Sequence, residues 1–78
     1  MSNAGSFAQW LTDQRTRTDG VGVLARELVG ALALGYRCPT SSDPATWRRW
    51  LAETGAAPAA VDALDLALLE YQQDRVAR

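Results

Sequence analysis

Apolar residues recur along the chain at the three- and four-residue spacing of α-helices, and no segment shows the two-residue alternation of a β-strand. The first helix is expected over about residues 7–15. Ser6 followed by Gln9 is the capping-box pattern, in which each side chain bonds the backbone N–H of the other and so starts a helix. One face of this helix collects three large apolar side chains, those of Phe7, Trp10 and Leu11.

A second helix is expected over about residues 20–33, because Asp19 is a favourable N-cap and helical spacing resumes directly after it. The residues expected to face the core are Val21, Leu24, Ala25, Leu28 and Leu32. Gly22 and Gly30 each cost this helix about 1 kcal/mol relative to alanine. Gly22 is expected to permit a close approach of two backbones, whereas no pattern in the sequence explains Gly30.

A third helix follows a segment rich in turn-forming residues. Asp43 is its expected N-cap and Pro44 its first helical residue, where the missing N–H of proline costs nothing. Gly55 is expected to end it. Its apolar face contains Trp47, Trp50 and Leu51.

The last and longest helix is expected to run from Pro58 to about residue 75, although its N-cap would be an alanine, which caps poorly. Its main apolar stripe is formed by Val61, Leu64, Leu68 and Tyr71. Leu66 and Leu69 fall outside this stripe, so the helix is apolar on more than one face. Either a fifth element covers these two leucines or they form an exposed patch for self-association.

These elements predict an all-α protein, a compact orthogonal bundle of four to five helices around one core. The short, varied loops fit this arrangement better than a regular up-and-down bundle. A chain of 78 residues makes one small domain, which we place at residues 6–78. Residues 1–5 contain the letters SNA, which look like an expression scar, so we give them no structural role.

Several segments occur together in one order: Phe7 with Trp10-Leu11, then Arg17-x-Asp19-x-x-Gly22-x-Leu24-Ala25, then Ala63-Leu64 with Tyr71. This order resembles the YozE SAM-like family of small bacterial proteins, over nearly all of residues 6–71. The resemblance implies a compact helical bundle similar to sterile alpha motif domains and no established activity. The chain departs from the family pattern at Ala31, Cys38 and Leu68, where an acidic residue, an aromatic residue and a tryptophan are expected.

The composition argues against an enzyme. All eight basic residues are arginine, and the chain has no histidine. It therefore lacks the usual base at neutral pH, the commonest metal ligand and a lysine for Schiff-base chemistry. Asp62 and Asp65 are spaced like paired carboxylates, but no third ligand or base lies near them in the sequence. We therefore expect no cofactor, no metal and no small-molecule substrate.

Cys38 is the only cysteine, so the chain cannot form an internal disulfide. No apolar run is long enough to span a membrane, and the N-terminus lacks a signal-peptide pattern. These features predict a cytoplasmic protein with no membrane partner. The abundance of alanine and arginine is typical of a GC-rich bacterial genome.

Arg48 and Arg49 lie between Trp47 and Trp50. One possibility is an exposed surface of arginine and aromatic side chains that binds a partner or stacks on bases. The other is a pair of solvated arginines beside two core tryptophans. An arginine patch that binds DNA would use Arg15, Arg17, Arg37, Arg48 and Arg49. Against that use, Arg17 is also expected to bond nearby acids or loop carbonyls, where Asp19 caps the second helix.

Charge is divided unevenly along the chain. Residues 1–49 carry six arginines and four acidic residues, residues 50–78 carry two and five, and the net charge is −1. Such a weak balance is not typical of a nucleic-acid-binding protein. Our first hypothesis is therefore a noncatalytic protein-interaction module, which self-associates or binds a protein partner. Its candidate binding residues are Leu66, Leu69, Arg48 and Arg49, and a DNA-associated domain is the alternative.

Overall fold

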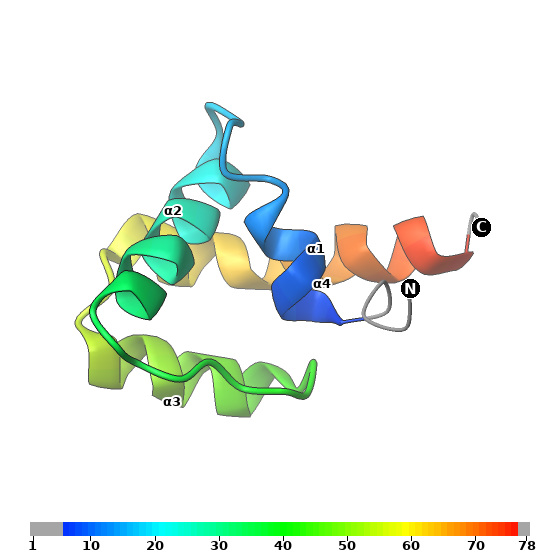
Figure 1. Cartoon of the computed structure of the whole chain (residues 1–78). Helices are drawn as coiled ribbons and strands as arrows, with labels where there is room; N and C mark the ends of the chain where they lie inside the picture. The colour runs from blue at the N-terminus through cyan, green and yellow to red at the C-terminus, as the bar shows by residue number, and fades with distance from the viewer. Residues whose placement is uncertain (1–5, 77–78) are drawn as a thin grey trace.

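The longest helix, α4, is the support against which the others pack, and its most extensive contact is with α2. In the computed structural model, residues 6–76 are described and form four helices and no strand: α1 (Phe7–Thr12), α2 (Gly20–Ala33), α3 (Pro44–Thr54) and α4 (Pro58–Val76). Figure 1 shows α1 and α2 in front of α4, with α3 below them. This confirms the all-α bundle. The expected expression scar at residues 1–5 lies outside the described residues.

Local capping begins three of these helices as the sequence predicts. In each, a side-chain oxygen accepts an N–H three residues on: Ser6 from Gln9 at 3.3 Å, Asp19 from Gly22 at 3.1 Å and Asp43 from Thr46 at 3.0 Å. Pro44 occupies the first turn of α3, and Gly55 ends that helix with a φ of 73°. Glycine adopts such a φ without strain, so the left-handed backbone at this position accounts for a glycine at the end of α3.

The first helix ends at Thr12, not near residue 15 as predicted. The Thr12 hydroxyl donates to the carbonyls of Ala8 at 2.8 Å and Gln9 at 2.9 Å. The Gln9 carbonyl is the acceptor that the Asp13 N–H would use in a continuing α-helix, and Asp13 bonds the Trp10 carbonyl instead. The backbone bonds that follow Thr12 span three residues, as in 3₁₀ turns, and lead the chain into the corner before α2.

The core is one apolar cluster to which all four helices contribute. Its large members include Phe7, Leu11, Leu24, Leu28, Trp47, Trp50, Leu51, Leu64, Leu68 and Tyr71, all of them predicted. Trp10 is half-buried at its edge and stacks on Phe7. Phe7 also meets Trp47 and Tyr71 edge to face, with ring centroids 5.0 and 5.4 Å apart. These contacts join the first, third and fourth helices.

The predicted inward position of Leu32 is wrong. Its side chain is 40% exposed, and Ala31 is buried instead. Because successive helical residues are rotated by about 100°, Leu32 lies only about 40° from Leu28 around the helix axis, and helical spacing alone does not account for its exposure. Leu32 lies in the last turn of α2, which ends at Ala33.

Both tryptophans of α3 belong to the core and also hold the preceding loop. Trp47 is fully buried, and its indole N–H donates to the Ser41 carbonyl at 2.8 Å. The Trp50 indole N–H donates to the Arg37 carbonyl. The second possibility for the Trp-Arg-Arg-Trp segment is therefore the observed one: the tryptophans are inside and the arginines between them are exposed.

Gly22 is required by a close approach of two backbones, as the sequence predicts. A Cβ at this position would lie 2.6 Å from the carbonyl carbon of Arg17 and nearer still to its oxygen. A Cβ at Gly30 would meet nothing within 4 Å. Within the single chain, close backbone packing therefore requires glycine at position 22 but not at position 30.

None of the described helices combines the length and the apolar character needed to cross a bilayer.

Gly22→Ala is expected to lower the free energy of unfolding by about 1–3 kcal/mol, because backbone must move to admit the methyl group. Gly30→Ala is the matched control and is expected to raise it by up to about 1 kcal/mol through helix propensity alone. Urea unfolding of both variants at low protein concentration measures the difference. Equal effects of the two substitutions would contradict the assigned role of Gly22.

Candidate functional site

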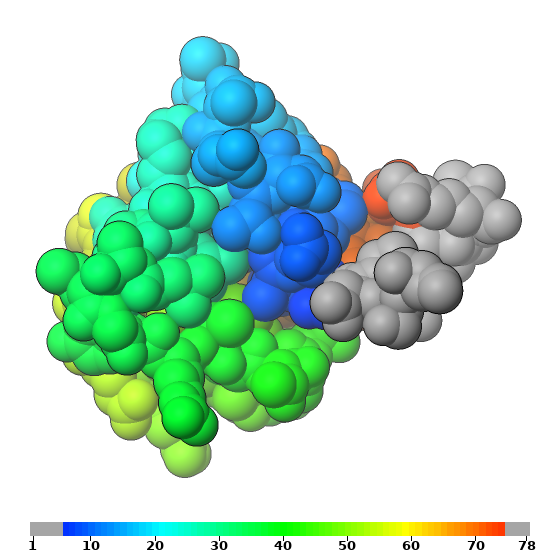
Figure 2. Space-filling view, viewed as in Figure 1, coloured from blue at the N-terminus to red at the C-terminus, as the bar shows by residue number. Residues whose placement is uncertain are grey.

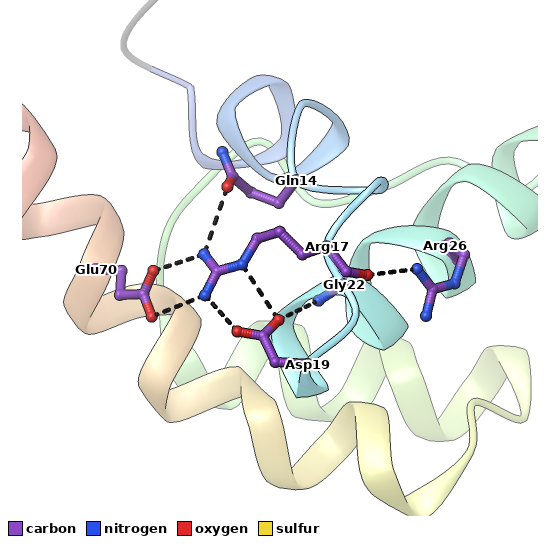
Figure 3. A network of polar contacts seen from close by, with 6 residues as sticks. All are labelled: Gln14, Arg17, Asp19, Gly22, Arg26 and Glu70. Atoms are coloured by element: carbon purple, nitrogen blue, oxygen red, sulfur yellow. Dashed lines mark hydrogen bonds and ion pairs between the residues drawn. The ribbon is translucent and has the colours of Figure 1, made fainter.

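The corner between α1 and α2 is fixed by one guanidinium (Figure 3). Arg17 donates from Nη1 to Glu70 Oε1 at 2.7 Å and from Nε to Asp19 Oδ1 at 3.2 Å, and its Nη2 pairs with the other oxygen of Asp19. Nη1 also reaches Gln14 Oε1 at 3.4 Å. Because Glu70 lies on α4, this side chain ties the corner to the longest helix.

Asp19 has two tasks in the same place. One carboxylate caps the N-terminus of α2 through the Gly22 N–H and pairs with Arg17. The Arg17 hydrogen bonds, and then that backbone N–H, hold the pKa of Asp19 below its usual value. The bonds to Glu70 and Asp19 raise the pKa of Arg17, so its charge is permanent.

Arg26 is a structural residue that the sequence gave no reason to single out. Its Nη1 donates to the carbonyls of Arg15 at 2.9 Å and Arg17 at 2.8 Å. It thus satisfies backbone acceptors of the corner that no helix uses. The available signal was its position four residues after Gly22, on the side of α2 that the corner approaches.

The candidate DNA-binding arginines do not form one track. Arg15 and Arg17 lie at the corner before α2, at the top of Figure 1, whereas Arg48 and Arg49 lie on α3 at the bottom. Arg15 donates to the Thr12 carbonyl at 2.9 Å. Arg48 pairs with Asp65 of α4 at 2.7 Å. Arg37 and Arg49 are exposed.

Two leucines are exposed on the outer side of α4. Leu66 is 49% exposed and Leu69 is 51% exposed. No fifth helix covers them among residues 6–76. Exposed polar residues continue the same side of the helix in both directions: Asp62 and Asp65 toward its N-terminus, Gln72 and Gln73 toward its C-terminus. We call these six residues the α4 docking face.

A second surface, which the sequence did not predict, runs along α2 from Val23 to the loop that follows the helix. A hollow of about 330 Å³ is lined by Val23, Arg26, Glu27, Gly30, Ala31, Leu34, Tyr36 and Thr54, and we call it the α2 groove. Leu34 at its rim is 80% exposed, and Tyr36 is 45% exposed. In the space-filling view this end of α2 and the following loop project from the left of the molecule (Figure 2).

The described residues bring together no group of three side chains suited to bind a metal ion. Cys38 is half-buried and packs against the core.

Comparison of the chain with protein-family models, with curated proteins and with solved structures found no match. Membership of the YozE SAM-like family therefore stays a prediction from the sequence.

Asp19 is expected to make the fold sensitive to acid. Since its pKa is lowered in the folded chain, its stabilising effect is complete above the unfolded value of about 4 and is lost as the pH falls through the folded value. Asp19→Asn keeps a capping oxygen but loses the charge. The urea midpoint of this variant should change less between pH 7 and pH 3 than that of the wild type.

Asp13→Asn is the control for loss of one exposed negative charge, because Asp13 lies outside the Arg17 network. If Asp13→Asn and Asp19→Asn alter the acid sensitivity equally, the ion pair with Arg17 is not its source.

Proposed function

We propose that the chain is a noncatalytic protein-interaction module of SAM-like helical fold, and that it self-associates through the α4 docking face. The observation that carries the proposal is the exposure of Leu66 and Leu69, one turn apart on a helix whose opposite side lies in the core. Exposed apolar pairs with polar borders are typical of binding surfaces.

The order of residues along this face suits contact with a second copy. Acidic side chains stand before the leucines and amide side chains after them. If two α4 helices meet antiparallel about a two-fold axis, Leu66 faces Leu69 of the second copy. Asp62 then faces Gln73 of the second copy, whose amide donates to a carboxylate. The same register places Asp65 opposite Glu70 of the second copy, and each of these carboxylates is already paired with an arginine of its own chain.

Arg48 borders this face through its ion pair with Asp65. Both side chains are largely exposed, so the pair contributes little to the stability of the isolated chain. Within a contact between copies, water is excluded from this ion pair, and the pair then helps to fix the orientation of one copy relative to the other. Arg49 lies next to it on α3 and belongs to the rim of the proposed contact.

Three observations support a protein partner over DNA. Arg17, the most plausible phosphate ligand at the corner, is already paired with two carboxylates. The remaining arginines are distributed to opposite ends of the bundle, and the net charge is −1. The noncatalytic assignment rests on the lack of histidine and lysine.

The double variant Leu66→Ser, Leu69→Ser is expected to lower the mass that the chain reaches at high concentration, because it removes the apolar centre of the contact. Light scattering across a concentration series measures this mass against the monomer mass of 8.4 kDa. Leu32→Ser is the control, since Leu32 is similarly exposed but lies on α2. A mass curve identical to that of the wild type would exclude the α4 docking face.

A short DNA duplex is expected to cause no salt-sensitive shifts in the amide NMR spectrum of the protein. Shifts that cluster at Arg48, Arg49 and the corner arginines Arg15 and Arg17, and that fade as salt increases, would instead support the DNA-associated alternative.

A further inference from the structure

We infer that the α2 groove is a second self-association site, in which the Leu34 side chain of each copy fills the groove of the other. The inference goes beyond the α4 docking face and uses none of its residues. It rests on a projection at the end of α2, and on a hollow and a pair of charges that lie along the same side of that helix.

Leu34 is a fixed projection. Its backbone N–H bonds to the carbonyls of Gly30 at 3.2 Å and Ala31 at 3.1 Å, which places it at the end of α2. The next residue, Gly35, has a φ of 97°, and the Tyr36 N–H then bonds back to the Ala31 carbonyl at 3.1 Å. This is the Schellman arrangement, which defines the path of the chain after a helix. The backbone that carries this 80% exposed leucine is therefore held in place before any partner arrives.

Gly30 gives the hollow its open floor. A Cβ there would meet nothing within 4 Å, so the fold of the single chain has no use for a glycine at this interior position of α2. Glycine nevertheless weakens a helix relative to alanine. The missing side chain leaves room between Val23, Ala31 and Tyr36, and an inserted apolar side chain would contact all three.

The charges at the rim select a second copy as the occupant. Arg26 and Glu27 are adjacent and of opposite sign. Under a two-fold axis every contact is made twice, so an ion pair between Arg26 and Glu27 of the second copy is matched by one between Glu27 and Arg26 of the second copy. A strongly acidic or strongly basic partner would repel one of the two. The bonds from Arg26 Nη1 to the corner carbonyls hold this side chain in position.

The shape of the surface around the α2 groove also favours a second copy of the chain as the occupant. One stripe of α2 carries both the projecting leucine and the empty hollow beside it, and an isologous contact buries each projection in the other hollow. Because the α4 docking face is separate, a chain that uses both contacts can join more than two copies.

The test measures mass by light scattering and sedimentation, up to a concentration on the order of 1 mM, which detects weak dimers. It starts from the Leu66→Ser, Leu69→Ser variant, in which the α4 docking face is disabled. This variant is expected to rise from 8.4 kDa toward twice that mass. Adding Leu34→Ser is expected to weaken its association by about 10-fold or more, while the exposed position leaves helicity unchanged.

Gly30→Gln is the second variant, since glutamine favours the helix but fills the floor of the groove. It should raise the thermal stability of the monomer and weaken association. Leu32→Ser is the control, because Leu32 is exposed on α2 but does not line the groove.

Association that survives both Leu34→Ser and Gly30→Gln overturns the inference. The two contacts can fail separately. If the Leu66→Ser, Leu69→Ser variant reaches the same mass as the wild type, the α4 docking face is not a contact. If adding Leu34→Ser leaves the mass of that variant unchanged, the groove is not a contact. A wild-type chain that stays at 8.4 kDa at every concentration overturns both.

Discussion

The contact on which this fold depends is the one between the Arg17 guanidinium and the carboxylates of Asp19 and Glu70. It joins residues 53 positions apart, and so fixes the corner of α1 and α2 against α4. Exposed ion pairs generally contribute about 0–1 kcal/mol, but the Arg17 side chain is only 30% exposed and donates to two carboxylates, one of which the Gly22 N–H also positions. The backbone of Arg17 is equally constrained, because it lies against Gly22 and its carbonyl accepts a hydrogen bond from Arg26. Charge, capping and close packing therefore meet at one turn of the chain.

Features that depend on a few neighbouring residues were predictable from the sequence. The N-caps Ser6, Asp19 and Asp43 and the need for Gly22 arise within one or two turns, and the core stripes follow from helical spacing. The predicted end of α1 failed because the Thr12 hydroxyl bonds the preceding turn, which spacing does not reveal. Leu32 was misplaced because the direction in which α2 leaves the core is set by its packing on α4.

The candidate site divides in the same way. The apolar excess on α4 was visible in the sequence, because Leu66 and Leu69 interrupt an otherwise regular stripe. The partner of Arg17 was not, since Glu70 approaches it only when α4 packs against the corner. The α2 groove was also hidden, because its walls come from α2, the loop after it and the end of α3. The unexplained Gly30 was the one signal that it left in the sequence.

The two indole bonds from α3 to the loop before it have a consequence for motion. If that loop detached, the N–H groups of Trp47 and Trp50 would lose their acceptors while their rings stayed in the core, at a cost of about 1–3 kcal/mol for each. The loop and α3 should therefore open together as one cooperative unit, with slow exchange of both indole protons. Tyr36 stands at the start of this loop and Thr54 at the end of α3. Thr54 would move with this unit, whereas Tyr36 is bonded to Ala31 at the end of α2. The width of the groove should therefore change with the same local equilibrium that governs the tryptophans.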